Sequence, residues 1–448
     1  MREHTKNIIE TLTNMNACLL GEGYDTRLEF IKQLVDIEVI EIPSGTELGT
    51  WTVPQEWIIR DAWVKDPEGN KIADYQANPL SLVVGSIPMH GMVSLEELRK
   101  HWHYSEEMPD ATPYVFKYYT EEWGFCFPKN VLKKVNEEAV EGIKLQDGKE
   151  FIPKTADKLK EGQYEIFIDS EFRKGNMKLG VHTIKGKSER EILLFAHLDH
   201  PFQANDNLSA VACLLDIASK IKSDKTVKII FCPETIGSTG YALTQDLSKV
   251  DFVVAVDICG NKNSILLQKS FGKEAQINRV AHLALQSLGE TYRKGEFRNT
   301  IGSDEGVFND PLIGIPGIMF SRWPYAEYHT SEDTADKIDY DSIETMGKLI
   351  LKLIEIWDKD FIPKREFKGQ MMRSRYGVQT ENKQLNLSWD YFIYAMDGKR
   401  YLSELCADYG INFDFALETV IKMENDKKIS RVSVGKKPKQ KTRKQKHS

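Results

Sequence analysis

The sequence predicts an α/β protein whose central sheet is parallel or mixed and carries helices on both faces. Short, continuous apolar runs such as EILLFAHL (191–198), TVKIIFC (226–232) and DFVVAV (251–256) are typical of buried strands. Segments with helical apolar spacing separate these runs, as in AVACLLDIASKI after the first of them. Strands that alternate with helices in this way predict a sheet that is covered on both sides.

The composition is that of an ordinary globular protein. The chain has 448 residues, of which 41% are apolar and 28% charged, and its net charge of −7 indicates no particular partner. Its six cysteines have no paired spacing, which predicts free thiols in a reducing cytoplasm rather than disulfides. The sequence contains no stretch of about 20 apolar residues, so we expect neither a membrane span nor a signal peptide.

The pattern along the chain predicts a nested domain organisation. Residues 1–58 and 151–362 are assigned to the α/β domain, and residues 59–150 to a small β-rich domain nested within it. Alternating aromatic and polar residues in TWTVPQEWIIRDAW predict strands, and a capping box from Ser94 to Glu97 predicts a short helix. The aromatic stretches HWHY and WGFCFP are typical of a small buried core, although they are also candidates for the roof of a substrate pocket.

The C-terminal part predicts a separate module. Residues 372–435 show a helix, a short helix, a longer helix and a strand in that order, which is typical of a winged helix. The longer helix carries Asp414, Glu418 and Glu424, so we favour packing or protein interaction over nucleic-acid binding. The last 13 residues, 436–448, contain seven Lys or Arg and no acid, which predicts a disordered basic tail.

Imidazole and carboxylate side chains follow the ends of the predicted α/β strands. Each one alone has an ordinary structural explanation, such as a helix cap or a turn. Together they predict a metal site, because neutral imidazole and carboxylate are typical ligands of zinc and similar ions. The residues are His197, Asp199, His200, Asp206, Glu234, Asp257 and His329. Asp199 is a candidate to hold the ring of His197, and Asp333 to hold that of His329.

Five stretches carry a resemblance to a known group of enzymes. HLDH…ANDNLSA, PETIGSTG, AVDICGN, GSDEGVF and YHTSEDTAD occur in the order and approximate spacing of zinc-dependent exopeptidases of the bacterial aminopeptidase and glutamate carboxypeptidase superfamily. The chain most resembles the bacterial aminopeptidase-like family, whose members carry a nested small β domain and a C-terminal winged helix. That family is often associated with surface-polysaccharide gene clusters. The resemblance covers nearly the whole chain apart from the basic tail.

The resemblance implies roles for most of the polar cluster. His197, Asp206 and Asp257 correspond to the ligands of a first zinc, and Asp206 would bridge to a second zinc beside His329. Glu234 corresponds to the general base. The chain departs from the two-zinc pattern because Thr235 occupies the second acidic position. The resemblance therefore leaves open whether one or two zinc ions bind. His200 is either a replacement ligand or a residue that only forms hydrogen bonds with the backbone.

The implied activity is metal-dependent hydrolysis of an amide, with a small peptide or an amidated sugar or metabolite as substrate and a possible role in surface-polysaccharide biosynthesis. Asp304 and Glu305 correspond to the substrate pocket and are candidates to bind a substrate amine. Two alternatives stay open: a single-zinc acyl transferase similar to glutaminyl cyclases, and a degenerate, non-catalytic binding or regulatory protein. The sequence leaves the substrate, the metal and any homo-oligomer undetermined.

Overall fold

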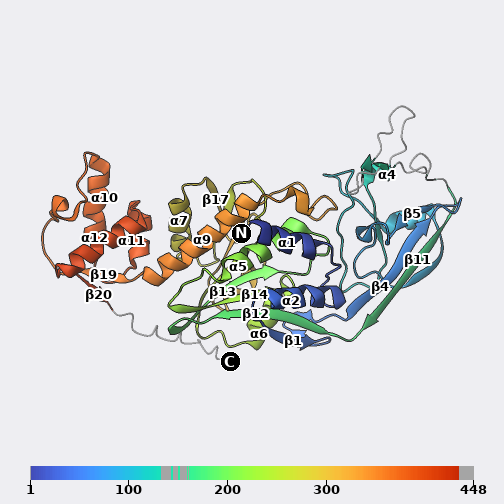
Figure 1. Ribbon diagram of the computed structural model, residues 1–448, viewed down its shortest axis with the longest axis horizontal. Helices are drawn as coiled ribbons and strands as arrows, with labels where there is room; N and C mark the ends of the chain where they lie inside the picture. Colours follow the sequence, from blue (N-terminus) through green and yellow to red (C-terminus); the bar gives the residue numbers. More distant parts are fainter. Residues whose placement is uncertain (1, 133–142, 145–149, 152–158, 160, 433–448) are drawn as a thin grey trace, which may run out of the picture. The chain divides into compact units, whose positions relative to one another are not determined.

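The computed structural model describes residues 2–132, 143–144, 150–151, 159 and 161–432 (Figure 1). The chain divides into two compact units. The first contains Met1–Lys273 and Thr291–Lys348, and the second contains Glu274–Glu290 and Leu349–Ser448. The predicted disordered tail at 436–448 lies outside the described residues.

A mixed eight-stranded sheet forms the centre of the first unit. Its strands, in order across the sheet, are β1 (Glu38–Pro43), β12 (Asn176–Ile184), β14 (Lys225–Cys232), β13 (Ser188–His197), β15 (Val250–Val256), β18 (Gly317–Ser321), β16 (Ile265–Gln268) and β17 (Tyr292–Gly295). The four strands β14, β13, β15 and β18 run parallel to one another, whereas β1 with β12, β12 with β14 and β18 with β16 form antiparallel pairs. The predicted apolar runs are parallel strands at the middle of this sheet, and most of their residues are buried.

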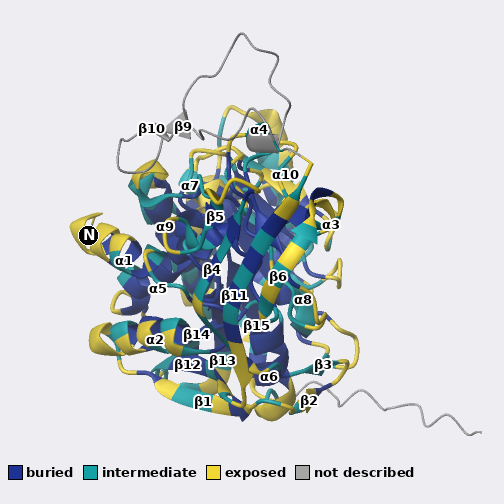
Figure 2. Cartoon of the chain, turned by 90° about the vertical axis from the view of Figure 1, so that its right-hand side faces the viewer, coloured by how far each residue is buried: buried dark blue, intermediate teal, exposed yellow. Residues whose placement is uncertain are grey.

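Helices cover both faces of the large sheet, as predicted (Figures 1 and 2). One face carries α1 (Arg2–Thr13), α2 (Glu22–Leu34), α5 (Ser209–Ala218) and the first part of α9 (Tyr340–Lys359), and the other carries α6 (Ile236–Thr244) and α8 (Glu305–Phe308). Phe195 of β13 packs on the second face against Tyr241 and Phe308. A Cβ atom at Gly237 would lie only 2.7 Å from Cys232 Cβ, so glycine lets α6 approach the sheet closely.

A second, four-stranded sheet belongs to the nested region (Figure 2). Its order is β5 (Lys71–Asp74), β4 (Glu56–Lys65), β11 (Gln163–Arg173) and β6 (Met89–Ser94). The predicted limits of 59–150 are too narrow for this sheet, because β11 pairs with β4 and β6 although the sequence assigned it to the α/β domain. The small sheet packs over a core that includes Trp102, Trp123, Phe125 and Phe127, which confirms the core interpretation of the aromatic stretches.

Short elements complete the first unit. The predicted helix after Ser94 is α3 (Leu95–Lys100), and the Ser94 hydroxyl accepts the Glu97 N–H. The others are β2 (Glu47–Leu48), β3 (Trp51–Thr52), η1 (Pro79–Ser81), β7 (Trp102–His103), β8 (Phe125–Cys126), α4 (Lys129–Leu132), β9 (Ile143–Lys144), β10 (Glu150–Phe151), η2 (Ala204–Leu208) and η3 (Ala335–Lys337). In the described part of the chain, every helix is too short or too polar to span a bilayer.

The second unit is mainly helical. It contains α7 (Gln276–Leu288), the end of α9, β19 (Ile362–Arg365), η4 (Arg373–Tyr376), α10 (Lys383–Tyr394), α11 (Leu402–Tyr409), α12 (Phe413–Asn425) and β20 (Ile429–Val432). The three helices and the final strand follow the predicted order, and β19 pairs antiparallel with β20. The unit is larger than the predicted 372–435, because α7 joins it from an earlier part of the chain. The winged-helix assignment stays a prediction.

A partly buried carboxylate links three elements of the second unit. Asp360 accepts hydrogen bonds from the Ser403 backbone N–H at 3.0 Å and from Gln276 Nε2 at 2.7 Å. Burial raises the pKa of Asp360 to about 6, although these donors act in the opposite direction. The folded state therefore binds this proton more tightly than the unfolded chain, whose Asp pKa is about 3.9.

We expect Asp360 to make the unit more stable in mild acid. Between the unfolded and the folded pKa the native state holds more protons, so the free energy of unfolding rises as the pH falls from about 7 to about 4. Asp360→Asn removes this contribution, whereas Asp397→Asn, at an exposed position, leaves it in place. Urea unfolding of both variants and the parent across this pH range measures the difference, and equal pH slopes for Asp360→Asn and the parent would contradict it.

Candidate metal centre

The large sheet brings the predicted polar residues to one edge. His197 is the last residue of β13, Glu234 lies two residues beyond β14, and Asp257 directly follows β15. These three strands are parallel neighbours, so their carboxyl ends meet at the same edge. His329 reaches this edge from the loop that follows β18, and Asp206 lies in the turn η2 before α5.

Asp206 is the centre of the cluster. Its Oδ1 lies 3.1 Å from His197 Nε2, and its Oδ2 lies 3.2 Å from His200 Nδ1 and 3.1 Å from His329 Nε2. His197 Nε2 is also 3.4 Å from Asp257 Oδ1. His197, His200, Asp206 and Asp257 are at most 4% exposed, while the His329 side chain is 20% exposed. The structure thus brings together all five predicted metal ligands.

Several atoms of this cluster have no hydrogen-bond partner although they are buried. They are His197 Nδ1, His200 Nδ1, Asp206 Oδ2, Asp257 Oδ1 and His329 Nε2. A buried polar atom without a partner is costly and indicates an ion or another missing ligand. Three overlapping sets of donors have the spacing of a metal site: His197–Asp199–His200, His200–Asp206–His329 and His197–Glu234–Asp257. The residues therefore fit a divalent cation with nitrogen and oxygen ligands.

The electrostatics of the cluster favour bound positive charge. Burial raises the pKa of Asp206, but His200, His197 and His329 outweigh this effect and hold the pKa well below its usual range. Burial lowers the pKa of His200, but Asp206 outweighs it and raises that pKa to about 10. A cation that binds here takes the place of protons on the imidazoles, so metal binding and proton release are coupled.

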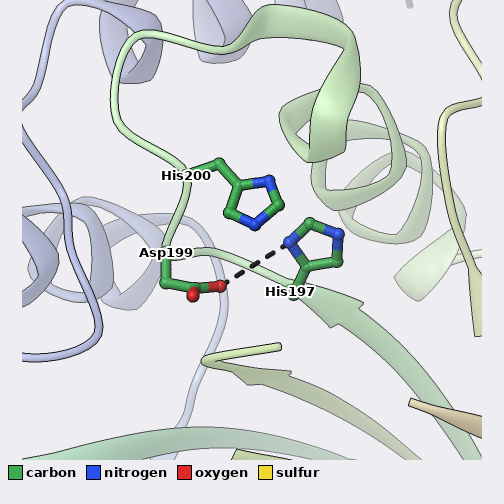
Figure 3. A group of neighbouring side chains, drawn as sticks. All are labelled: His197, Asp199 and His200. Carbon is green, nitrogen blue, oxygen red and sulfur yellow. Dashed lines mark ion pairs between the residues drawn. The ribbon is translucent and has the colours of Figure 1, made fainter. Parts of the chain in front are cut away.

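Asp199 supports two residues of the cluster. Its Oδ1 accepts the Glu234 backbone N–H at 2.9 Å and faces His197 Nδ1 at 3.6 Å (Figure 3). The second distance is an ion-pair distance that is long for a hydrogen bond. Asp199 is therefore placed to fix the start of the Glu234 turn, and its role in orienting the imidazole of His197 stays a prediction.

The loop that carries Asp206 is fixed by its neighbours in sequence. Asn205 Oδ1 accepts the Gly260 N–H at 2.8 Å, and Asn207 Oδ1 accepts the Ile258 N–H at 3.1 Å. Asn207 also donates to the Val256 carbonyl. The NDN sequence thus attaches Asp206 to the end of β15, and Asp206 does not cap α5, which begins without a side-chain cap.

Asp333 has a different role from the one predicted. Its carboxylate accepts the backbone N–H groups of Asn205 at 2.7 Å and Asp206 at 3.0 Å, and the Tyr325 hydroxyl at 2.8 Å. The expected pairing with His329 is therefore wrong, because both oxygens are engaged by the Asp206 loop and Tyr325. Asp333 holds the backbone of Asp206 rather than the ring of His329.

Asp304 and Glu305 are buried and already engaged. Asp304 Oδ1 accepts the Thr235 N–H at 3.0 Å. Glu305 accepts Gln268 Nε2 at 3.1 Å and the Ser303 N–H at 3.0 Å, and it is 0% exposed. These contacts correct the expectation of a substrate contact at Glu305, since its carboxylate stabilises the surrounding loops. Asp304 lies against the Glu234–Thr235 turn and supports that turn.

Sequence reasoning missed two residues that hold the cluster in place. Arg27 of α2 is fully buried and donates from Nη1 to the carbonyls of Leu198 at 2.7 Å and His200 at 2.9 Å. Tyr114, from the nested region, donates its N–H to the His329 carbonyl at 2.7 Å. Arg27 could have been noticed, because it lies three residues after Tyr24 and four before Ile31, on the apolar face of α2. Nothing in the sequence around Tyr114 indicates its contact with His329.

The comparisons with known proteins agree with this fold. A crystal structure described as a peptidase from Clostridium acetobutylicum is 26% identical, with a TM-score of 0.78 and coverage of 96% of both chains. A zinc aminopeptidase from Bacillus subtilis is 14% identical, covers 79% of this chain and 94% of its own, and has a TM-score of 0.56, which shows the fold alone. The fold is therefore that of the zinc exopeptidases, as the sequence predicted.

The family follows from the sequence matches. A family model described as "Domain of unknown function (DUF4910)" matches residues 6–360, and the chain belongs to this family. A Clostridium acetobutylicum protein, named for polysaccharide biosynthesis and an aminopeptidase-like domain, is 32% identical over 356 residues. The match covers 78% of this chain and 76% of that protein. The predicted resemblance to the aminopeptidase-like family is thereby confirmed.

We expect Arg27→Met to destabilise the first unit. The methionine leaves the carbonyls of Leu198 and His200 without their donor, at a cost of about 1–3 kcal/mol for each buried carbonyl. Arg2→Met is the control, because Arg2 is exposed and forms an exposed ion pair with Asp341. Urea unfolding of both variants measures the change, and a loss for Arg27→Met no larger than for Arg2→Met would contradict the role of Arg27.

Proposed function

We propose that this protein is a metal-dependent hydrolase that cleaves an amide bond at the Asp206 centre. One observation carries the proposal: three imidazoles and two carboxylates converge on one buried point with several of their polar atoms unpartnered. Its position at the carboxyl ends of parallel strands is where α/β sheets bind their ligands. The aminopeptidase-like relative supports the reaction class.

His197, Asp206 and Asp257 are the residues that would hold a first metal ion. Zinc is the proposed metal, since imidazole and carboxylate ligands suit it and the Bacillus subtilis neighbour is a zinc aminopeptidase. When bound, a divalent ion lowers the pKa of water and polarises a carbonyl group. Asp199 would keep the His197 ring oriented with Nε2 toward the carboxylates.

Glu234 is the proposed general base. It lies in the same donor set as His197 and Asp257, and its side chain is 28% exposed, so it can contact both the cluster and solvent. Burial raises the pKa of Glu234, but His197 and His200 outweigh it and lower that pKa, so the carboxylate is ionised at neutral pH. An ionised carboxylate here would take a proton from the attacking water and return it to the leaving amine.

The proposed substrate is a small peptide or an amide of a sugar or metabolite. The name of the Clostridium acetobutylicum relative supports a place in surface-polysaccharide biosynthesis. The six cysteines are all unpaired and buried, which supports the cytoplasmic location that we propose.

Glu234→Gln should reduce amide hydrolysis by about 10²–10⁴-fold, because the amide cannot accept the proton of water. The variant should keep the metal content of the parent, since His197, Asp206 and Asp257 are intact. Glu296→Gln, which changes an exposed glutamate, is the matched control. Aminoacyl nitroanilides, dipeptides and N-acetylated amino sugars form the substrate panel, and undiminished turnover by Glu234→Gln would remove this residue from the role.

Asp206→Asn should abolish metal binding. An amide supplies less negative charge than a carboxylate, and Asp206 is the residue that faces three imidazoles. Elemental analysis of the purified variant after exposure to zinc and removal of the excess measures the loss, with the exposed Asp169→Asn as control. Equal zinc content in Asp206→Asn and the parent, or no zinc in the parent, would contradict the proposed function.

A further inference from the structure

We propose that residues 112–119 of the nested region form a binding site for a ring of the substrate, with Phe116 as its specificity-determining residue. The inference rests on the proposed function, because the site lies beside the metal centre and the ring belongs to the group next to the scissile amide. Phe116 comes from the nested region, whereas the candidate metal ligands come from the α/β domain.

The metal centre is open to solvent on one side. The side chains of Glu234 and His329 are 28% and 20% exposed, whereas the other candidate ligands are at most 4% exposed. A substrate amide therefore reaches the centre past Glu234 and His329. Phe116 lies at this open side, because its ring centroid is 6.3 Å from that of His329.

Backbone hydrogen bonds hold the segment 112–119 on both of its edges. On one edge, the Lys117 N–H donates to the Val84 carbonyl at 2.9 Å. On the other edge, the Tyr114 N–H donates to the His329 carbonyl at 2.7 Å. The backbone of Phe116 lies between these two bonds, so its position relative to His329 is fixed, as a preorganised binding site requires.

Alternate side chains of the segment form a row of three rings. The ring centroid of Phe116 lies 5.5 Å from that of Tyr114 and 5.1 Å from that of Tyr118. Tyr114 is buried, and its ring centroid lies 5.1 Å from that of His329. Burial raises the pKa of Tyr118, and the charge of Glu234 adds to this effect, which agrees with a position near Glu234. The row thus follows the open side from His329 toward Glu234.

Phe116 is the ring of this row that a ligand can contact, because it is 42% exposed. Its plane makes an angle of 71° with the His329 imidazole. Tyr328, which is 36% exposed, stacks on the same imidazole at 15°. The two exposed rings are therefore steeply inclined to each other beside His329. A ring that binds between them can stack on one and meet the other edge-on, and these are the two favoured arrangements of aromatic pairs.

Polar side chains of the segment are engaged by the protein itself. Lys117 forms an ion pair with Glu122, and the Tyr119 hydroxyl donates to the Thr52 carbonyl at 2.8 Å. Stacking on an apolar face is therefore the main interaction that the segment offers to a substrate. An aromatic side chain and a sugar ring both present such a face, and these are the two possible sources of the ring.

The test compares amide pairs that differ by one ring, with the zinc-loaded full-length protein. Phenylalaninamide is paired with alaninamide to probe an aromatic ring, and N-acetylglucosamine with N-acetylethanolamine to probe a sugar ring. The parent should prefer the ring-bearing member of one pair, and Phe116→Ala should lower this preference in kcat/KM about tenfold, mainly through KM. Phe116→Tyr should keep the preference. Phe172→Ala is the matched control, because Phe172 on β11 is 37% exposed.

A binding measurement gives the same preference without turnover. Calorimetry with zinc-loaded Glu234→Gln, alone and combined with Phe116→Ala, measures the affinity for the same four compounds. Thermal unfolding shows whether each variant is folded. Phe116→Leu tests the same site should Phe116→Ala fail to fold, because leucine keeps the apolar volume and loses the flat face.

The possible results separate this inference from the proposed function. A preference for phenylalaninamide that Phe116→Ala removes supports the site with an aromatic side chain as its ligand, and the same result for N-acetylglucosamine supports it with a sugar ring. Hydrolysis without a ring preference, or with an equal preference in Phe116→Ala, overturns the inference and leaves the proposed function intact. Ring-dependent binding without hydrolysis by the parent overturns the proposed function alone. The absence of both hydrolysis and ring-dependent binding overturns both.

Discussion

The burial of one carboxylate, that of Asp206, governs the structure around it. A carboxylate that is 1% exposed is strongly unfavourable unless charged or hydrogen-bonding partners surround it. Here three imidazoles face the side chain, and Asp333 accepts the N–H of its own backbone. These partners come from two segments, the end of β13 and the loop that follows β18, so the position of Asp206 determines how those segments meet.

The order of strands explains why the partners can meet. β13 lies between β14 and β15, and the residues that follow these three parallel strands are therefore neighbours. His329 lies farther along the chain, and its loop is held by the nested region through hydrogen bonds between Thr112 and Ser331 and between Tyr114 and His329. The nested region is thus part of the centre, because one of its segments fixes the loop that carries a candidate ligand.

The sequence predicted the strand-end residues because their position depends on local pattern alone. Each lies within two residues of a buried apolar strand, as His197, Glu234 and Asp257 show. It could not predict partners that depend on tertiary contacts. Asp333 has the spacing to support His329 but lies against the Asp206 loop instead, and β11 has the pattern of an ordinary strand, so nothing local shows which of two sheets it joins.

The residues beside the metal centre indicate which of the proposed amide substrates the protein would accept. Glu305 is fully buried and Asp304 supports the Thr235 turn, so the predicted anchor for a substrate ammonium group is occupied. Aromatic rings lie beside His329 instead: Tyr328 stacks on it at 3.8 Å and is 36% exposed, and Phe116 lies 6.3 Å away and is 42% exposed. Exposed aromatic faces favour apolar or ring-shaped groups. Among the proposed substrates, this surface suits an amide next to a ring, whether of a side chain or of a sugar, better than one that is recognised through a free amine.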